Sequence, residues 1–101
     1  MLSEFSFEQL QKLPVSEIFG TGSNTFEVIY TVNTVPSKVW INARDFKTAV
    51  NFFCKRFGLG EATTEAHSIV AMKLRFWRIY ARDALTNARK YDDAIIRRIR
   101  R

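Results

Sequence analysis

Residues 73–82 read KLRFWRIYAR, with four cations and three aromatic rings in ten positions. Cations of this kind bind phosphate groups, and exposed rings beside them stack on nucleobases. In an α-helix, however, the two kinds of side chain separate. At 100° per residue the rings gather on one side, while Arg75, Arg78 and Arg82 form a wedge about 60° wide on the other. The helical interpretation therefore disfavours a stacking platform and leaves a stripe of arginines.

The arginine stripe is predicted to continue toward the C-terminus. On the same helical count Arg89 and Arg100 join the wedge, and the terminal RRIRR adds a cationic cluster. A stripe of this kind neutralises phosphates and releases counterions, whereas the alternative interpretation is a solvated face. We predict a non-enzymatic, nucleic-acid-associated protein that binds the phosphate backbone. The predicted contacts are Arg75, Arg78, Arg82, Arg89, Arg97, Arg98, Arg100 and Arg101.

The charge distribution supports an anionic partner. Residues 1–61 hold six cations and six anions, whereas residues 62–101 hold ten cations and four anions. The whole net charge of +6 therefore lies in the C-terminal forty residues. Such asymmetry favours nucleic acid, an acidic protein or an acidic membrane surface as partner, and the alternative is a role in solubility alone.

Other reactive or ligating groups are sparse. His67 is the only histidine and Cys54 the only cysteine, so no zinc-binding spacing exists. Asp92 and Asp93 would face different directions on a helix, which disfavours an acid–base pair. GTGSN (20–24) precedes a predicted strand and lacks the lysine of a phosphate-binding loop. We therefore predict no enzyme activity, no cofactor and no metal.

The N-terminal region predicts a short helix. FSFEQLQKL (5–13) has Ser6 followed by Gln9 three places on, which is a capping-box pattern, and Pro14 ends the helix. The next segment, VSEIF (15–19), fits either one helical turn or a short strand.

A β-hairpin is predicted next. TFEVIYTVN (25–33) alternates, with one side made of Phe26, Val28, Tyr30 and Val32 and the other of Glu27, Ile29 and Thr31. KVWINA (38–43) alternates again, so the two runs form a hairpin with a loop of about five residues.

A helix over 45–57 follows from the recurrence of apolar residues every three or four positions. Asp45 suits its start and Gly58 its end, and Cys54 is expected to pack as a small apolar residue. INARDF (41–46) resembles a strand-to-helix junction found in phage antirepressor proteins. The likeness covers six residues and implies nothing further about function.

From Thr63 or Thr64 onward no glycine or proline interrupts the chain, which predicts one helix of over thirty residues, about 50 Å long. Apolar residues in it alternate four and three apart, as in a heptad seam. The seam could pack within the protein, pair two copies in a homodimer or dock a partner helix. Its predicted members are Val70, Leu74, Trp77, Ala81, Ala84, Ala88, Tyr91 and Ile95.

These segments predict a single α+β domain over 1–101: a short N-terminal helix, a β-hairpin, an amphipathic helix and a long basic C-terminal helix. A second functional hypothesis is a small adaptor or inhibitor of viral or mobile-element type, which would bind a host protein through that long helix. The N-terminus has acids where a secretory signal needs cations, and no run reaches the length of a membrane span. We therefore expect a soluble intracellular protein, cytoplasmic in its own cell or, if viral, in its host.

Overall fold

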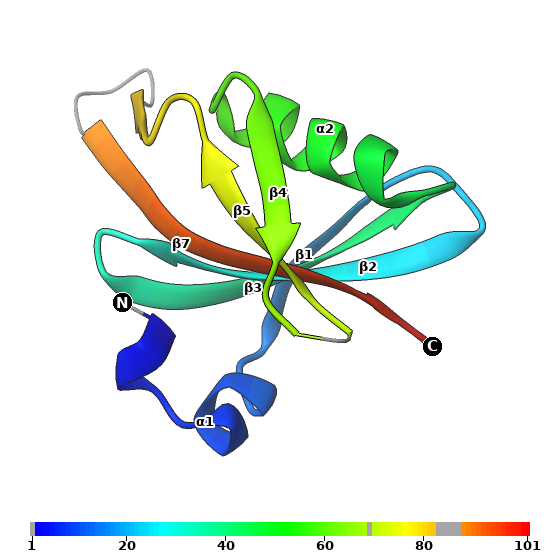
Figure 1. Ribbon diagram of the computed structural model, residues 1–101, viewed down its shortest axis with the longest axis horizontal. Coiled ribbons are helices and arrows are strands. Elements are labelled where there is room, and N and C mark those ends of the chain that lie inside the picture. Colours follow the sequence, from blue (N-terminus) through cyan, green and yellow to red (C-terminus); the bar gives the residue numbers. More distant parts are fainter. Residues whose placement is uncertain (1, 69, 83–87) are drawn as a thin grey trace.

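A curved mixed β-sheet dominates the computed structural model, which describes residues 2–68, 70–82 and 88–101 (Figure 1). Within these residues the sheet has seven strands, ordered β1-β3-β2-β7-β5-β4, and β6 pairs separately with β7. β1 runs parallel to β3, and the other pairs are antiparallel. The elements in chain order are a 3₁₀ turn Leu2–Glu4, α1 Phe7–Gln11, β1 Val15–Gly20, β2 Asn24–Val32, β3 Val35–Ala43, α2 Phe46–Phe57, β4 Ala62–Ala66, β5 Met72–Phe76, β6 Tyr80–Arg82 and β7 Ala88–Ile99.

The short N-terminal helix is confirmed. The Ser6 hydroxyl accepts a hydrogen bond from the Gln9 N–H at 3.1 Å, and the Gln9 side chain accepts one from the Ser6 N–H at 2.8 Å. Both halves of the capping box are therefore formed, which satisfies two backbone donors that the helix itself leaves free. The ambiguous segment after the helix is the edge strand β1.

The hairpin is also confirmed, but its predicted five-residue loop is wrong. β2 and β3 pair along their full length, and only Asn33 and Thr34 form the turn, with φ of 49° and 70°. Two successive positive φ values give a turn whose twist matches that of the strands. The Asn33 side chain accepts a hydrogen bond from the Lys90 N–H at 2.9 Å, which ties the turn to β7.

α2 begins and ends where the sequence predicts. The Asp45 carboxylate caps it by accepting the Thr48 N–H at 2.8 Å, and this hydrogen bond lowers the pKa of Asp45. Gly58 ends the helix at φ 69°, a left-handed conformation that costs glycine little. Cys54 is buried as a small apolar residue, again as predicted.

The predicted long C-terminal helix is wrong, because residues 62–99 supply β4, β5, β6 and β7 instead. In β5 the side chains of Met72, Leu74 and Phe76 turn toward the core, and those of Lys73 and Arg75 alternate with them. This is the two-residue period of a strand. The helical interpretation had no place for Lys73, which projected into its apolar arc.

β7 explains why the same region imitates a helix. Tyr91, Ala94 and Ile96 are its buried residues, and the step of three between Tyr91 and Ala94 breaks the strand's alternation. The pairing of β2 with β7 shifts at this point, between Tyr30 and Val32. A β-bulge adds one residue to one strand, so the apolar spacing across it resembles the three-to-four spacing of a helix.

The predicted heptad seam is not a continuous surface. Val70 and Trp77 are 68% and 78% exposed, whereas Leu74 and Tyr91 are buried in the core. The four remaining positions differ again: Ala81 and Ile95 are half-buried, Ala88 begins β7, and Ala84 lies outside the described residues. A partner or second copy therefore has no helix of this kind to bind.

The hydrophobic core lies between the sheet and α2, which crosses one face of it (Figure 1). Phe53 of α2 is fully buried and its ring meets Tyr30 at 5.1 Å. Phe26, Val28, Val39 and Ile41 fill the same side of β2 and β3, as their alternation predicts. In the part of the chain that the structure describes, no helix is long and apolar enough to cross a membrane.

The opposite face carries α1 and a group of side chains that we call the closed cluster: Glu27, Lys38, Trp40 and Arg97. Glu27 is 4% exposed and accepts hydrogen bonds from Trp40 at 3.0 Å and from Arg97 at 3.1 Å. Lys38, also 4% exposed, lies 3.8 Å from Glu27 and donates to the Gln11 carbonyl at the end of α1. The cluster therefore joins three strands to the N-terminal segment.

Candidate functional site

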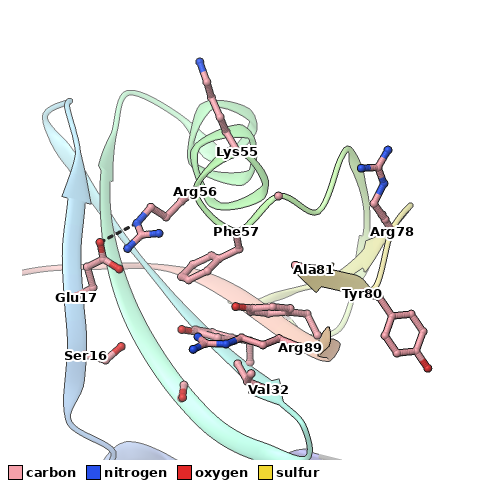
Figure 2. A pocket seen from close by; sticks show the side chains of 14 residues that line it. Ser16, Glu17, Val32, Lys55, Arg56, Phe57, Arg78, Tyr80, Ala81 and Arg89 are labelled. Carbon is pink, nitrogen blue, oxygen red and sulfur yellow. Dashed lines mark hydrogen bonds and ion pairs between the residues drawn. The ribbon is translucent and has the colours of Figure 1, made fainter. Parts of the chain in front are cut away.

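An open cavity of about 1060 Å³ lies beside the C-terminal end of α2 (Figure 2). Strands β1, β2, β3 and β7 form its floor and one wall, α2 forms another, and the segment around β6 forms the third. Its lining residues are Ser16, Glu17, Tyr30, Val32, Ser37, Lys55, Arg56, Phe57, Gly58, Arg78, Tyr80, Ala81, Arg89 and Tyr91.

Three aromatic rings form the floor of this cavity. Tyr30 and Tyr91 stack at 5.8 Å with an angle of 20°, because β2 and β7 are neighbours and both rings rise from the α2 side. Phe57 contacts both, at 5.5 Å from Tyr30 and 5.4 Å from Tyr91. Tyr30 and Tyr91 are only 4% and 3% exposed, so they hold Phe57 rigidly, and half-buried Phe57 supplies most of the apolar surface that a flat ligand can meet.

Hydroxyl groups lie beside the rings. Ser37 is the cross-strand neighbour of Tyr30, and Ser16 reaches the same region from β1 (Figure 2). Burial raises the pKa of the Tyr30 phenol above its ordinary value of 10.0. The phenol therefore stays protonated at physiological pH and keeps its capacity to donate a hydrogen bond.

The cations come from three separate elements. Lys55 and Arg56 belong to the last turn of α2, where positive charge suits the helix dipole, Arg78 lies between β5 and β6, and Arg89 is on β7. Figure 2 shows Arg56 and Arg89 near the Phe57 ring, whereas Lys55 and Arg78 point away from it. Arg89 already makes an interaction within the protein.

One carboxylate offsets part of this charge. Glu17 accepts a hydrogen bond from Arg56 at 2.9 Å across the mouth, and the two side chains are 34% and 50% exposed. Among the lining residues four cations thus face one anion, so the cavity carries a formal charge of +3. Arg56 also lies over the Phe57 ring at 5.2 Å, which orients its guanidinium.

The rim at Arg78 is fixed by backbone hydrogen bonds. The Trp77 N–H donates to the Glu61 carbonyl at 2.7 Å, and the Arg78 N–H donates to the Leu59 carbonyl at 3.2 Å. The Ile79 carbonyl accepts from the Tyr91 N–H at 2.7 Å. This segment is therefore attached on one side to the end of α2 and on the other to β7.

The predicted arginine stripe is wrong, since its members are distributed over different parts of the sheet. Of the eight predicted contacts, Arg78 and Arg89 line the cavity. Arg97 belongs to the closed cluster, and Arg75 pairs with Glu65 at 2.8 Å. The others are elsewhere: Arg82 ends β6, Arg98 and Arg100 are exposed near the C-terminus, and Arg101 lies over the Trp40 ring at 5.2 Å. A backbone-binding helix that aligns them does not exist.

The sequence interpretation missed most of the cavity. Glu17, Tyr30, Lys55 and Arg56 were not among the predicted site residues, and Tyr91 was predicted only as a member of the helical seam. The positions of Tyr30 and Tyr91 in strands could have been found from alternation, but their contact depends on the register between β2 and β7. Pairing over such a distance leaves no local signal in the sequence.

Histidine and cysteine take no part in the cavity. His67 follows β4, and its N–H donates to the Ala71 carbonyl at 3.2 Å. Burial raises the pKa of the Cys54 thiol to about 11. Within the described ranges no group of three or more His, Cys, Asp or Glu side chains lies close enough to hold a metal ion.

Comparison with known proteins gives no match to a family model, to a curated protein or to a solved structure.

Proposed function

We propose that the protein binds an organic anion that has a planar ring, in the cavity beside the end of α2. One observation carries the proposal: cations from three elements surround a floor of three packed rings and several hydroxyls. Phosphate or carboxylate groups suit the guanidinium of Arg56, which offers several donors in a plane. A flat ring suits the apolar surface at Phe57, against which the buried Tyr91 ring packs.

The proposed contacts follow the chemistry of each part of the cavity. The anionic group lies between Arg56 and Arg89, where Glu17 now holds Arg56 at 2.9 Å. The ring of the ligand lies against Phe57, and Tyr30, kept protonated by burial, donates to a polar atom. The cavity combines apolar rings, hydroxyls and net positive charge, and a nucleotide carries groups that complement all three on one molecule. We assign no catalytic step to this cavity.

The test is calorimetric titration with adenosine 5′-monophosphate, with adenosine and inorganic phosphate as partial ligands. We expect the monophosphate to bind more tightly than either part, since it engages both rings and cations. Arg56→Gln should weaken its binding roughly tenfold, because a charged hydrogen bond is lost and Glu17 is left unopposed.

Arg44→Gln is the matched control. Arg44 is also exposed and also pairs with a carboxylate, Asp45, at 3.4 Å, but it lies outside the cavity. This variant changes the net charge equally and should leave binding unchanged. Equal losses in Arg44→Gln and Arg56→Gln, or no binding of the monophosphate at millimolar concentration, would contradict the proposed function.

A further inference from the structure

Trp77 is the most exposed large apolar side chain among the described residues, at 78%. It lines a second cavity, with Gly60 and Arg75, and is followed in the chain by Arg78, which lines the first. Tyr80, three positions after Trp77, is 56% exposed. Single exposed apolar residues are common on protein surfaces. Here two exposed rings lie within four positions, with Arg78 between them. We call this pair, Trp77 and Tyr80, the rim aromatics.

The indole of Trp77 is held in place although it is exposed. Its backbone N–H donates to the Glu61 carbonyl at 2.7 Å, which fixes the main chain at this residue. A Cβ atom at Gly60 would lie only 3.2 Å from the Trp77 ring, so the ring packs closely on the bare glycine backbone. The ring as a whole stays 78% exposed, so a base can reach it with little prior ordering of the main chain.

The charge beside this ring suits an anion. The guanidinium of Arg78 lies 5.7 Å from the centre of the Trp77 ring. Arg75 is paired with Glu65, but Arg78 has no carboxylate partner within the described residues. A ring and an available cation on one rigid segment match a nucleobase and a phosphate.

We infer that the ligand is single-stranded nucleic acid, with one nucleotide in the cavity and a neighbouring base stacked on Trp77. This inference rests on the proposed function, since the cavity supplies the first nucleotide site. It differs from a stripe of arginines along a duplex, because exposed rings require unpaired bases that a double helix keeps stacked inside.

The closing experiment measures fluorescence anisotropy of labelled oligonucleotides about ten nucleotides long, oligo(dU) and oligo(rU), which differ only in the sugar, at low salt. Trp77→Ala should weaken binding of both about tenfold, and Trp77→Phe, which keeps a ring, should weaken it less. Phe7→Ala is the matched control, because Phe7 is 72% exposed on α1 and lies outside both the cavity and its rim. Stronger binding of the ribose form would indicate RNA as the natural ligand, and equal binding would indicate no choice of sugar.

The outcomes separate this inference from the proposed function. Trp77→Ala should leave the affinity for adenosine monophosphate unchanged, because that ligand occupies only the cavity. If Trp77→Ala binds the oligonucleotides as tightly as the unchanged protein while the monophosphate still binds, the inference is overturned and the proposed function stands. If neither ligand binds, both are overturned. The inference would also be overturned if a duplex bound as tightly as the single-stranded oligonucleotides. Competition by polyglutamate as strong as that by unlabelled oligonucleotide would overturn it in favour of an acidic protein partner.

Discussion

On the face of the sheet that carries α1, Glu27 is buried among donors from β3 and β7, and on the face that carries α2, Glu17 meets Arg56 at the mouth of an open cavity. Both carboxylates therefore bind an arginine, at 3.0 Å and 2.9 Å. They differ in what surrounds them. The closed cluster leaves no room for a ligand, whereas the cavity leaves its cations in reach of solvent.

The comparison indicates that burial, more than charge, separates an arginine that stabilises the fold from one that is accessible to an anionic ligand. Arg97 and Arg56 have the same chemistry and similar partners, but the Arg97 side chain is 31% exposed and bonded within the closed cluster, and that of Arg56 is 50% exposed. A buried ion pair is costly to form and costly to break, while an exposed pair is nearly neutral in energy. An anionic ligand can therefore displace Glu17 from Arg56 at little cost.

The largest effect should come from Glu27→Gln. The amide removes the charge that compensates buried Lys38 and turns N–H groups toward donors such as Trp40. Breaking a buried pair by neutralising one partner costs about 3–5 kcal/mol, so urea unfolding followed by circular dichroism should show a loss of this size. A loss below about 1 kcal/mol would mean that the cluster is hydrated and that the comparison fails.

Alkaline pH tests how tightly α2 closes the core next to the open cavity. Cys54 is 3% exposed, and burial raises its thiol pKa from 9.0 to about 11. Since the folded state holds the proton more tightly than the unfolded state, this contribution is fully present below pH 9 and is lost as the pH rises to about 11. The loss is about 3 kcal/mol.

Cys54→Ala is the control for that titration. It removes the thiol but keeps Tyr30, whose raised pKa also lowers stability as the pH rises above 10.0. The difference in slope between the two proteins therefore isolates the thiol. Identical slopes between pH 9 and 11 would show that folding does not raise the thiol pKa and that the core beneath α2 is not closed to solvent at Cys54.

The first half of the fold was predictable because its signals are local. The capping box at Ser6, the alternation of β2 and the caps of α2 each involve residues a few positions apart. The two-residue turn at Asn33 and Thr34 was missed because it requires positive φ at two residues other than glycine.

The prediction for residues 62–99 was wrong because both a helical period and a strand period fit the same apolar residues. Leu74 and Trp77 fit a helix, whereas Met72, Leu74 and Phe76 fit a strand, and only the strand explains Lys73. The length of the predicted helix was also evidence against it. A helix of about 50 Å exceeds the longest dimension of the protein, which is 37 Å.

The candidate site was less predictable than the fold. Its cations and rings come from elements that meet only through sheet register or through the packing of α2 on the sheet, as Glu17 and Arg56 do across 39 positions. The sequence did identify residues 73–82 as unusual. It assigned the rings of that segment to a core, although Trp77 and Tyr80 are exposed.

The smallest effect on stability should come from Glu17→Gln, the same chemical change as in the closed cluster but at the cavity mouth. Both partners of this pair are partly exposed, so the free energy of unfolding should change by less than about 1 kcal/mol. Its effect on binding should have the opposite sign to that of Arg56→Gln. With its partner neutral, Arg56 is released toward an anion, and the affinity for adenosine monophosphate should rise severalfold in the calorimetric titration.

Glu8→Gln on α1 controls for the change in net charge, because Glu8 is also exposed and also paired, with Lys12 at 3.7 Å. A rise of equal size in both variants would mean that overall charge governs binding. An unchanged affinity in Glu17→Gln would mean that the anion does not compete for Arg56, and the distinction between a closed and an open pair would then describe stability alone.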